Sequence, residues 1–171
     1  FLVDTGDWQA AESVLSAIDH VDDDAELHFL KLKVKVLLGD PKAPSKLARM
    51  AREDGLRSSV ERFEAEVMEA KGDLRGALKA YARALETTPS DRLAALGLAR
   101  VRLRSKEARG ALHAADLALG IDPKDWEPHR IKADAYELLG EHEKAAREVE
   151  HAKELLILSG FGQEDSSGGT S

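Results

Sequence analysis

A repeat with a period of 34 residues constrains the fold of this chain more than any other feature. Residues 71–91 read KGDLRGALKAYARALETTPSD, and a shift of 34 positions aligns this segment with KEARGALHAADLALGIDPKD at residues 106–125. A further shift reaches GEHEKAAREVEHAKEL, which starts at Gly140. A period of this length indicates that one small structural unit is stacked several times along the chain.

The residues that keep this register are those that packed helices require. Gly72 and Gly140 permit the left-handed backbone conformation that often ends a helix, and Pro89 and Pro123 separate one helix pair from the next. Small residues spaced seven apart share one helix face and allow close backbone approach. They are Ala77, Ala84, Ala111, Ala118, Ala145 and Ala152. A composition of 33% charged and only 5% aromatic residues also favours helices over a sheet.

The pattern resembles the tetratricopeptide repeat, whose units have a Gly-Asp-like turn between two helices, small residues where helices cross, an aromatic residue on the second helix and a closing proline. Tyr81, Tyr136, Pro89 and Pro123 stand at matching positions. The resemblance implies an all-α fold, a right-handed superhelical solenoid of antiparallel helix hairpins. The Ala-, Arg- and Leu-rich composition suggests a bacterial source.

The repeat weakens toward the N-terminus but continues. Gly6, Gly39 and Gly72 are each followed by Asp and lie 33 residues apart. Pro44 replaces the packing alanine, so we expect the second helix there to start late, with Pro44 in its first turn. We predict a solenoid over residues 1–158, with a partial unit at 1–24, hairpins at about 25–57, 58–91, 92–125 and 126–158, and a polar, partly disordered tail at 159–171.

The first helix of each hairpin lines a concave groove in the family that this chain resembles, and helical periodicity selects the residues on that face. The candidate partner-binding residues are Phe29, Lys33, Val36, Arg62, Glu66, Leu93, Leu96, Arg100, Leu103, Arg104, Arg130 and Asp134. The mixture suits an amphipathic helix or extended peptide that carries apolar and acidic side chains, because arginine can bind a carboxylate in a bidentate manner.

Two alternatives stay open for this groove. Arg100 and Arg104 could instead pair with glutamates of adjacent hairpins, and the apolar residues of the helix at 92–104 could pack against neighbouring helices. In the same family a carboxylate clamp for chaperone C-termini uses asparagine at two positions. This chain contains no asparagine, so the resemblance does not imply a clamp of that type.

Composition sets several function classes aside. The net charge of −7 argues against nucleic-acid binding, which requires a strongly basic surface. The absence of cysteine excludes disulfides and thiolate chemistry but fixes no compartment. No apolar run approaches the length that spans a bilayer. We therefore expect a soluble domain, cytoplasmic or periplasmic. Because Phe1 lies within an unfinished hairpin, we expect a preceding part of the protein, which could carry an anchor.

We find no motif for catalysis, and expect no catalytic residue, cofactor or metal. None of the six histidines is part of a His-Glu-x-x-His motif, and we expect none of them to have a second metal ligand three or four residues away. Asp19, Asp22 and Asp24 lack the Gly and the terminal Glu that a calcium loop has at fixed offsets. Gly160-Phe161-Gly162 lacks the third glycine and the preceding strand of a dinucleotide loop. No serine stands in a nucleophile-elbow pattern.

The function expected from these observations is a protein–protein interaction scaffold that recruits a partner into a multiprotein assembly. Two alternatives remain. Leu155 to Leu158 and Phe161 could mediate self-association through an open end of the stack, giving a homo-oligomer. The chain could also be the regulatory repeat domain of a larger membrane-anchored envelope, export or secretion protein.

Overall fold

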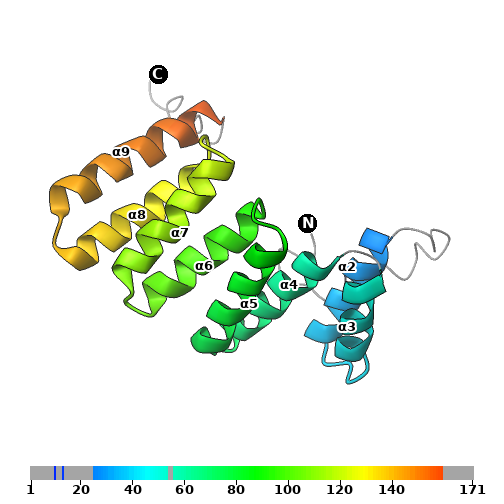
Figure 1. The fold of residues 1–171 in the computed structure, drawn as a ribbon. Helices are drawn as coiled ribbons and strands as arrows, with labels where there is room; N and C mark the ends of the chain where they lie inside the picture. Colours follow the sequence, from blue (N-terminus) through cyan, green and yellow to red (C-terminus); the bar gives the residue numbers. More distant parts are fainter. Residues whose placement is uncertain (1–9, 11–12, 14–24, 54–55, 160–171) are drawn as a thin grey trace, which may run out of the picture. The chain divides into compact units, whose positions relative to one another are not determined.

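The computed structural model describes residues 10, 13, 25–53 and 56–159 (Figure 1). Within these residues the chain forms eight α-helices and no strand, so the predicted all-α class is confirmed. The helices are α2 (Ala25–Leu37), α3 (Ala43–Glu53), α4 (Arg57–Ala70), α5 (Leu74–Thr87), α6 (Arg92–Arg104), α7 (Ala108–Ile121), α8 (Trp126–Leu139) and α9 (His142–Leu158). None of them is long and apolar enough to cross a membrane. Apart from Ala10, Ser13 and Ser159, the predicted partial unit and tail lie outside the described residues.

The chain divides into two compact units, residues 1–63 and 64–171, and the boundary falls within α4. In the first unit α2 packs against α3. Gly39 ends the first of these helices with a φ of 85°. Pro44 lies in the first turn of α3, as its position in the repeat predicts. The buried residues of this unit include Leu32, Val34, Leu47, Met50, Val60 and Phe63.

In the second unit each helix from α5 to α9 packs against the next one along the chain, and α6 also contacts α8. Contact between the first helices of consecutive hairpins is the arrangement that a stack of identical hairpins produces. Aspartates start three of these helices. Asp73, Asp91 and Asp125 accept hydrogen bonds from backbone N–H groups of α5, α6 and α8 at 2.9, 3.0 and 3.0 Å, and so satisfy donors that a helix N-terminus leaves unpaired.

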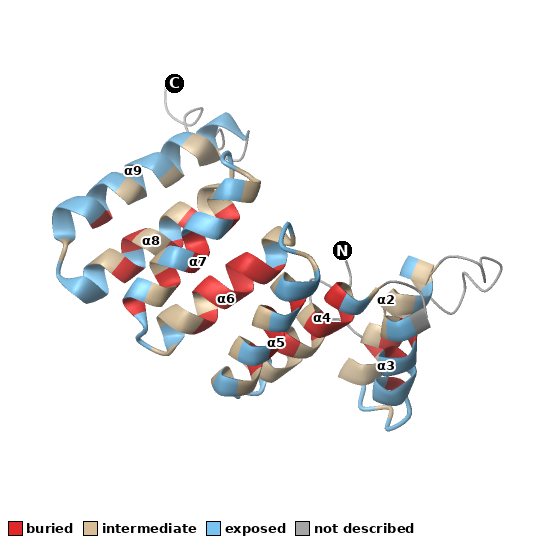
Figure 2. Cartoon of the chain, in the orientation of Figure 1, coloured by how far each residue is buried: buried red, intermediate tan, exposed pale blue. Residues whose placement is uncertain are grey.

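The repeated alanines occupy the crowded positions of the core. Ala77, Ala84, Ala111 and Ala118 are 0% exposed. Figure 2 shows α6 buried along most of its length, while the outer surface of α9 is exposed. Because α6 buries Ala94, Ala95, Leu96, Gly97, Leu98, Ala99 and Val101, most of its apolar residues pack against neighbouring helices, in agreement with the packing alternative.

Lys106 offers a direct test of the repeat. It occupies the position held by Gly72 and Gly140 in the adjacent units, and all three have left-handed backbone, with φ of 63°, 81° and 74°. A side chain in this region costs roughly 1 kcal/mol. We expect Lys106→Gly to raise the free energy of unfolding by about 0.5–1 kcal/mol, and Gly140→Ala, which meets no atom within 4 Å, to lower it by about 1 kcal/mol. Urea denaturation followed by circular dichroism measures both, and a loss of stability in Lys106→Gly would contradict this account.

Candidate functional site

In the first unit, three of the predicted groove residues line one pocket. Phe29 and Lys33 on α2 and Arg62 on α4 border a space of about 490 Å³. The other lining residues are Glu26, Leu27, Leu30, Leu56 and Ser59. The pocket therefore combines apolar walls with two cationic side chains and one carboxylate, that of Glu26. Val36, which lies on α2, is half-buried and is not among the lining residues.

Lys33 is held by aromatic rings. Its Nζ atom lies 5.6 Å from the ring centroid of Phe29 and 4.9 Å from that of Phe63, and the two rings meet edge to face at 6.4 Å. An ammonium group over a ring face is attracted by the electrons of that ring. These contacts keep a positive charge close to the apolar wall of the pocket.

In the second unit, Glu69, Tyr81, Arg100 and Arg104 form what we call the Glu69 cluster. The Tyr81 hydroxyl donates to Glu69 Oε2 at 3.1 Å, Arg104 Nη1 donates to Oε1 at 3.2 Å, and Arg100 Nη2 lies 3.5 Å from Oε2. Arg100 Nη1 also lies 3.5 Å from Glu127 Oε1 on α8. The arginines thus pair within the chain, which is one of the alternatives left open by the sequence.

Burial differs sharply within the Glu69 cluster. The side chain of Glu69 is 14% exposed, whereas those of Arg100 and Arg104 are 37% and 50% exposed. Burial lowers the pKa of Arg100, but attraction by Glu69, Tyr81 and Glu127 outweighs it, so the net shift is upward. The carboxylate therefore lies inside and holds two guanidinium groups at the surface.

The remaining predicted residues of the second unit differ in their accessibility. Leu93 is 47% exposed on α6, whereas Glu66 on α4 and Leu103 on α6 are half-buried. Arg130 and Asp134 are 53% and 52% exposed and lie 3.8 Å apart on α8. Leu96 is only 1% exposed. Helical periodicity places Leu96 on the same face as Leu93 but does not show what packs against that face. The prediction from periodicity therefore assigned a core residue to the surface.

Tyr81 makes stability depend on pH. Its burial, followed by the charge of Glu69, raises its pKa far above the ordinary value of about 10. Above pH 10 the unfolded chain therefore loses this proton before the folded chain does, so the contribution of Tyr81 to stability is complete below pH 10 and is lost as the pH rises. We expect the free energy of unfolding to fall with pH above 10 more steeply in the wild type than in Tyr81→Phe, by up to about 1.4 kcal/mol per pH unit. Equal slopes in chemical denaturation at several pH values would contradict the assignment.

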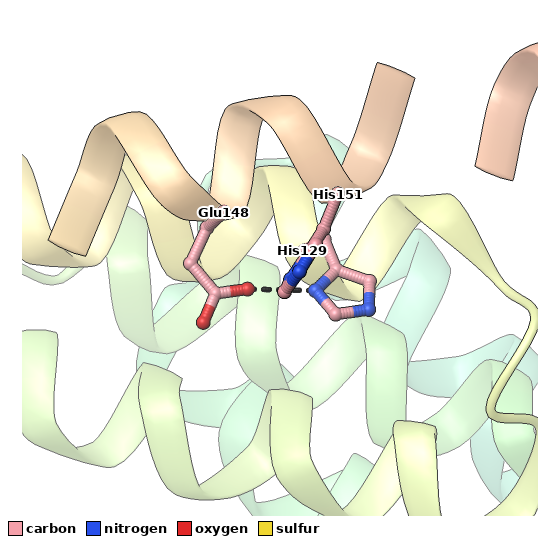
Figure 3. Close-up of side chains that lie close together, drawn as sticks. All are labelled: His129, Glu148 and His151. Carbon is pink, nitrogen blue, oxygen red and sulfur yellow. Dashed lines mark hydrogen bonds and ion pairs between the residues drawn. The ribbon is translucent and has the colours of Figure 1, made fainter. Parts of the chain in front are cut away.

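A third group of side chains lies between α8 and α9. Figure 3 shows His129, Glu148 and His151 gathered together, with one potential ligand atom of each within 4.8 Å of the others. His129 Nδ1 lies 2.6 Å from Glu148 Oε2. The expectation that no histidine has a second ligand at helical spacing is wrong for His151, because Glu148 precedes it by three residues. That spacing could have identified this pair, whereas His129 joins it only through the packing of two helices.

Comparison with known proteins identifies the fold. No family model and no curated protein sequence matches the chain. A crystal structure of MamA, a protein with tetratricopeptide-like repeats, superposes with a TM-score of 0.69 at 19% identity, covering 93% of this chain and 94% of MamA. A second structure, that of MamA MSR-1, gives a TM-score of 0.65 at 21% identity and covers 92% of each chain. The second TPR of Spaghetti (RPAP3), bound to the HSP90 peptide SRMEEVD, gives 0.57 at 17% identity and covers 61% of this chain and 97% of that one. The chain has a tetratricopeptide-repeat fold.

Both candidate surfaces belong to the first helices of tetratricopeptide-repeat hairpins. The pocket around Lys33 lies on α2 and α4, and the Glu69 cluster joins α4 to α6 with Tyr81 from α5. His129 lies on the first helix of its hairpin, while Glu148 and His151 lie on the second. The histidine group is therefore a different site from the two first-helix surfaces.

Proposed function

We propose that the chain is a protein-interaction scaffold that binds a helix or extended segment of a partner protein through the first helices of its hairpins. The observation that carries this proposal is the pocket of about 490 Å³ lined by Phe29, Lys33 and Arg62. The RPAP3 repeat domain, which has the same kind of fold, binds a peptide with an acidic C-terminal half. The partner segment proposed here carries an apolar anchor followed by acidic groups.

The chemistry of the pocket supports this choice of ligand. Its apolar wall includes Phe29, Leu30 and Leu56, which suits the burial of one apolar side chain. Lys33 and Arg62 outnumber the one carboxylate of the pocket, Glu26. They suit a carboxylate of the ligand, because charged groups arranged to complement a ligand give specificity and speed up association. The pocket thus favours a ligand with both properties over a purely apolar or purely acidic one.

The Glu69 cluster supplies a second contact surface, in the other unit. Arg104 is half exposed, and a guanidinium group has five N–H donors, more than one carboxylate can accept. Leu93, exposed at 47% on the same helix, adds apolar area. We propose that acidic groups of the partner bind the outer side of Arg100 and Arg104 while Glu69 holds these arginines from within.

A selection of phage-displayed random peptides on the purified chain tests the function. We expect enriched peptides that combine an apolar residue with acidic residues. Fluorescence polarisation then gives the affinity of one labelled peptide for each variant. Charge reversal in Lys33→Glu/Arg62→Glu is expected to weaken binding by tenfold or more, since about 1.4 kcal/mol corresponds to a factor of ten. Arg100→Glu/Arg104→Glu is expected to weaken the binding of acidic peptides that dock on the Glu69 cluster.

Matched control substitutions on second helices carry the same charge change when they are combined in one variant. Lys46→Glu on α3 and Arg109→Glu on α7 alter exposed residues outside both surfaces, and the double variant should keep the wild-type affinity. If these controls weaken binding as much as the first-helix variants, the effect reflects net charge alone. In that case, or if all variants bind like the wild type, the proposed surface is incorrect.

Self-association is a second candidate function, favoured by exposed apolar residues at the end of α9. Ile157 and Leu158 are 57% and 81% exposed. Large apolar side chains at such exposure mark many protein contacts. Light scattering over a range of concentrations distinguishes the candidates: an oligomer that Ile157→Glu/Leu158→Glu converts to a monomer supports self-association, and a strict monomer at high concentration excludes it.

A further inference from the structure

We propose that His129, Glu148 and His151 form a binding site for a divalent transition-metal ion, of which Zn²⁺ is the representative. The site would join α8 to α9, since His129 comes from the first of these helices and the other two residues from the second. It is independent of the peptide-binding surfaces proposed above. Three ligands of the types His, His and Glu occur together in zinc sites that keep a fourth position open.

The geometry is close to what a tetrahedral ion requires. Zn–N and Zn–O bonds of about 2.0–2.2 Å place neighbouring ligand atoms about 3.3–3.5 Å apart. In the chain, the three ligand atoms all lie within 4.8 Å of one another, and the His129 Nδ1 and Glu148 Oε2 atoms are 2.6 Å apart. The two imidazole rings have centroids 5.5 Å apart and are inclined at 74° (Figure 3). To bind an ion, the His129 and Glu148 atoms must move apart and all three ligand atoms must adopt the spacing of about 3.3–3.5 Å.

The neighbouring charges are compatible with a cation. Lys132 Nζ lies 3.0 Å from Glu148 Oε1 and 3.1 Å from Asp116 Oδ1, so its charge is shared between two carboxylates. With neutral imidazoles, the two carboxylates and one ammonium leave a net negative site. Lys132 contacts Oε1, whereas Oε2 is the oxygen beside His129. A second residue that fixes the orientation of a metal ligand is a common feature of metal sites.

Accessibility also suits a metal ion. The side chains of His129 and Glu148 are each 14% exposed, and His151 is exposed. The first two ligands are thus held by the packing of α8 on α9, while the third can turn and leaves a path from solvent. Because an ion bound only by the folded chain stabilises it, the ion would strengthen the last hairpin.

Calorimetric titration of Zn²⁺ into the tag-free, chelator-treated full chain tests the site. We expect one ion per chain and a melting temperature several degrees higher with zinc. Co²⁺ in place of Zn²⁺ should give the intense visible absorption of a tetrahedral site. His151→Ala, which alters an exposed residue, and His129→Ala should each weaken zinc binding by tenfold or more, and circular dichroism verifies that both variants fold.

The control is His142→Ala on the same helix. His142 is 75% exposed and lies 2.7 Å from Glu137, so it is a surface histidine beside a carboxylate. Among the residues that the structure describes it is not part of any group of three potential ligands. This variant should keep wild-type zinc affinity, stoichiometry and thermal shift. The proposal is overturned if wild-type chain binds no zinc, if His151→Ala and His129→Ala both bind as the wild type does, or if His142→Ala loses binding to the same extent.

Discussion

Gly97→Ala is expected to destabilise the chain by about 3 kcal/mol or more, the upper range of overpacking effects. Gly97 is buried in α6, and a methyl group there would overlap the ring of Tyr81 on α5, coming within 2.7 Å of its hydroxyl oxygen. Tyr81 is 0% exposed and hydrogen-bonded to Glu69, so its ring cannot turn aside without losing packing and that bond. The absence of a side chain at Gly97 therefore allows two hairpins to meet.

Chemical denaturation followed by circular dichroism measures this effect, and Gly120→Ala is the matched control. Gly120 is also helical, on α7, but a methyl group there meets no atom within 4 Å. That variant should be as stable as the wild type or more stable by up to about 1 kcal/mol, because alanine favours helix. Combining Gly97→Ala with Tyr81→Leu should recover part of the loss, since two residues in contact are energetically coupled. A Gly97→Ala variant with wild-type stability would contradict the packing.

Glu69→Ala is expected to lower the free energy of unfolding by about 2 kcal/mol, which is the second largest effect that we predict. Glu69 is mostly buried and accepts from Tyr81 and Arg104 while lying 3.5 Å from Arg100. Its removal leaves a buried hydroxyl without its acceptor, and it takes from Arg104 and Arg100 the carboxylate they share, although Arg100 keeps its pairing with Glu127. Unsatisfied buried groups cost about 1–3 kcal/mol each. Partial exposure of both arginines limits the total, because water replaces part of the lost interaction.

Glu64→Ala provides the comparison for this effect on the same helix. Glu64 pairs with Arg83 at 3.3 Å, but both side chains are well exposed, at 43% and 51%. Surface pairs of this kind contribute about 0–1 kcal/mol. Denaturation of both variants should therefore show a much larger loss for Glu69→Ala, and equal losses would mean that the Glu69 cluster is only a surface ion pair.

The fold could be predicted because its determinants recur in the sequence. Ala77, Ala111 and Ala145 stand at the same position in successive hairpins. At each position a neighbouring helix leaves no room for a larger side chain. Lys106 adopts a left-handed backbone conformation where other units have glycine. The repeated backbone geometry is therefore kept even where one residue departs from the pattern. Because the pattern occurs several times, one exceptional residue does not hide it, and the architecture can be predicted from the sequence.

The details of the candidate surfaces could not be predicted in the same way. Periodicity assigns a residue to a face of its own helix, but Leu96 is buried by helices that periodicity does not specify. Glu69 pairs with Arg104 across 35 positions, and His129 meets Glu148 across 19. These contacts depend on the packing of helices on one another, so the sequence could indicate which charges lie near the surface but left their partners open.

The most direct test of the central proposal is hydrogen–deuterium exchange of the chain with and without a selected peptide. If the first helices bind the partner, amide protection should increase in α2 and α4 around the Lys33 pocket for peptides that dock there, and in α6 for acidic peptides that dock on the Glu69 cluster. The second helices α3, α7 and α9 should show smaller changes. Protection confined to α9, or to other second helices, would contradict the assignment of the binding surface to the first helices.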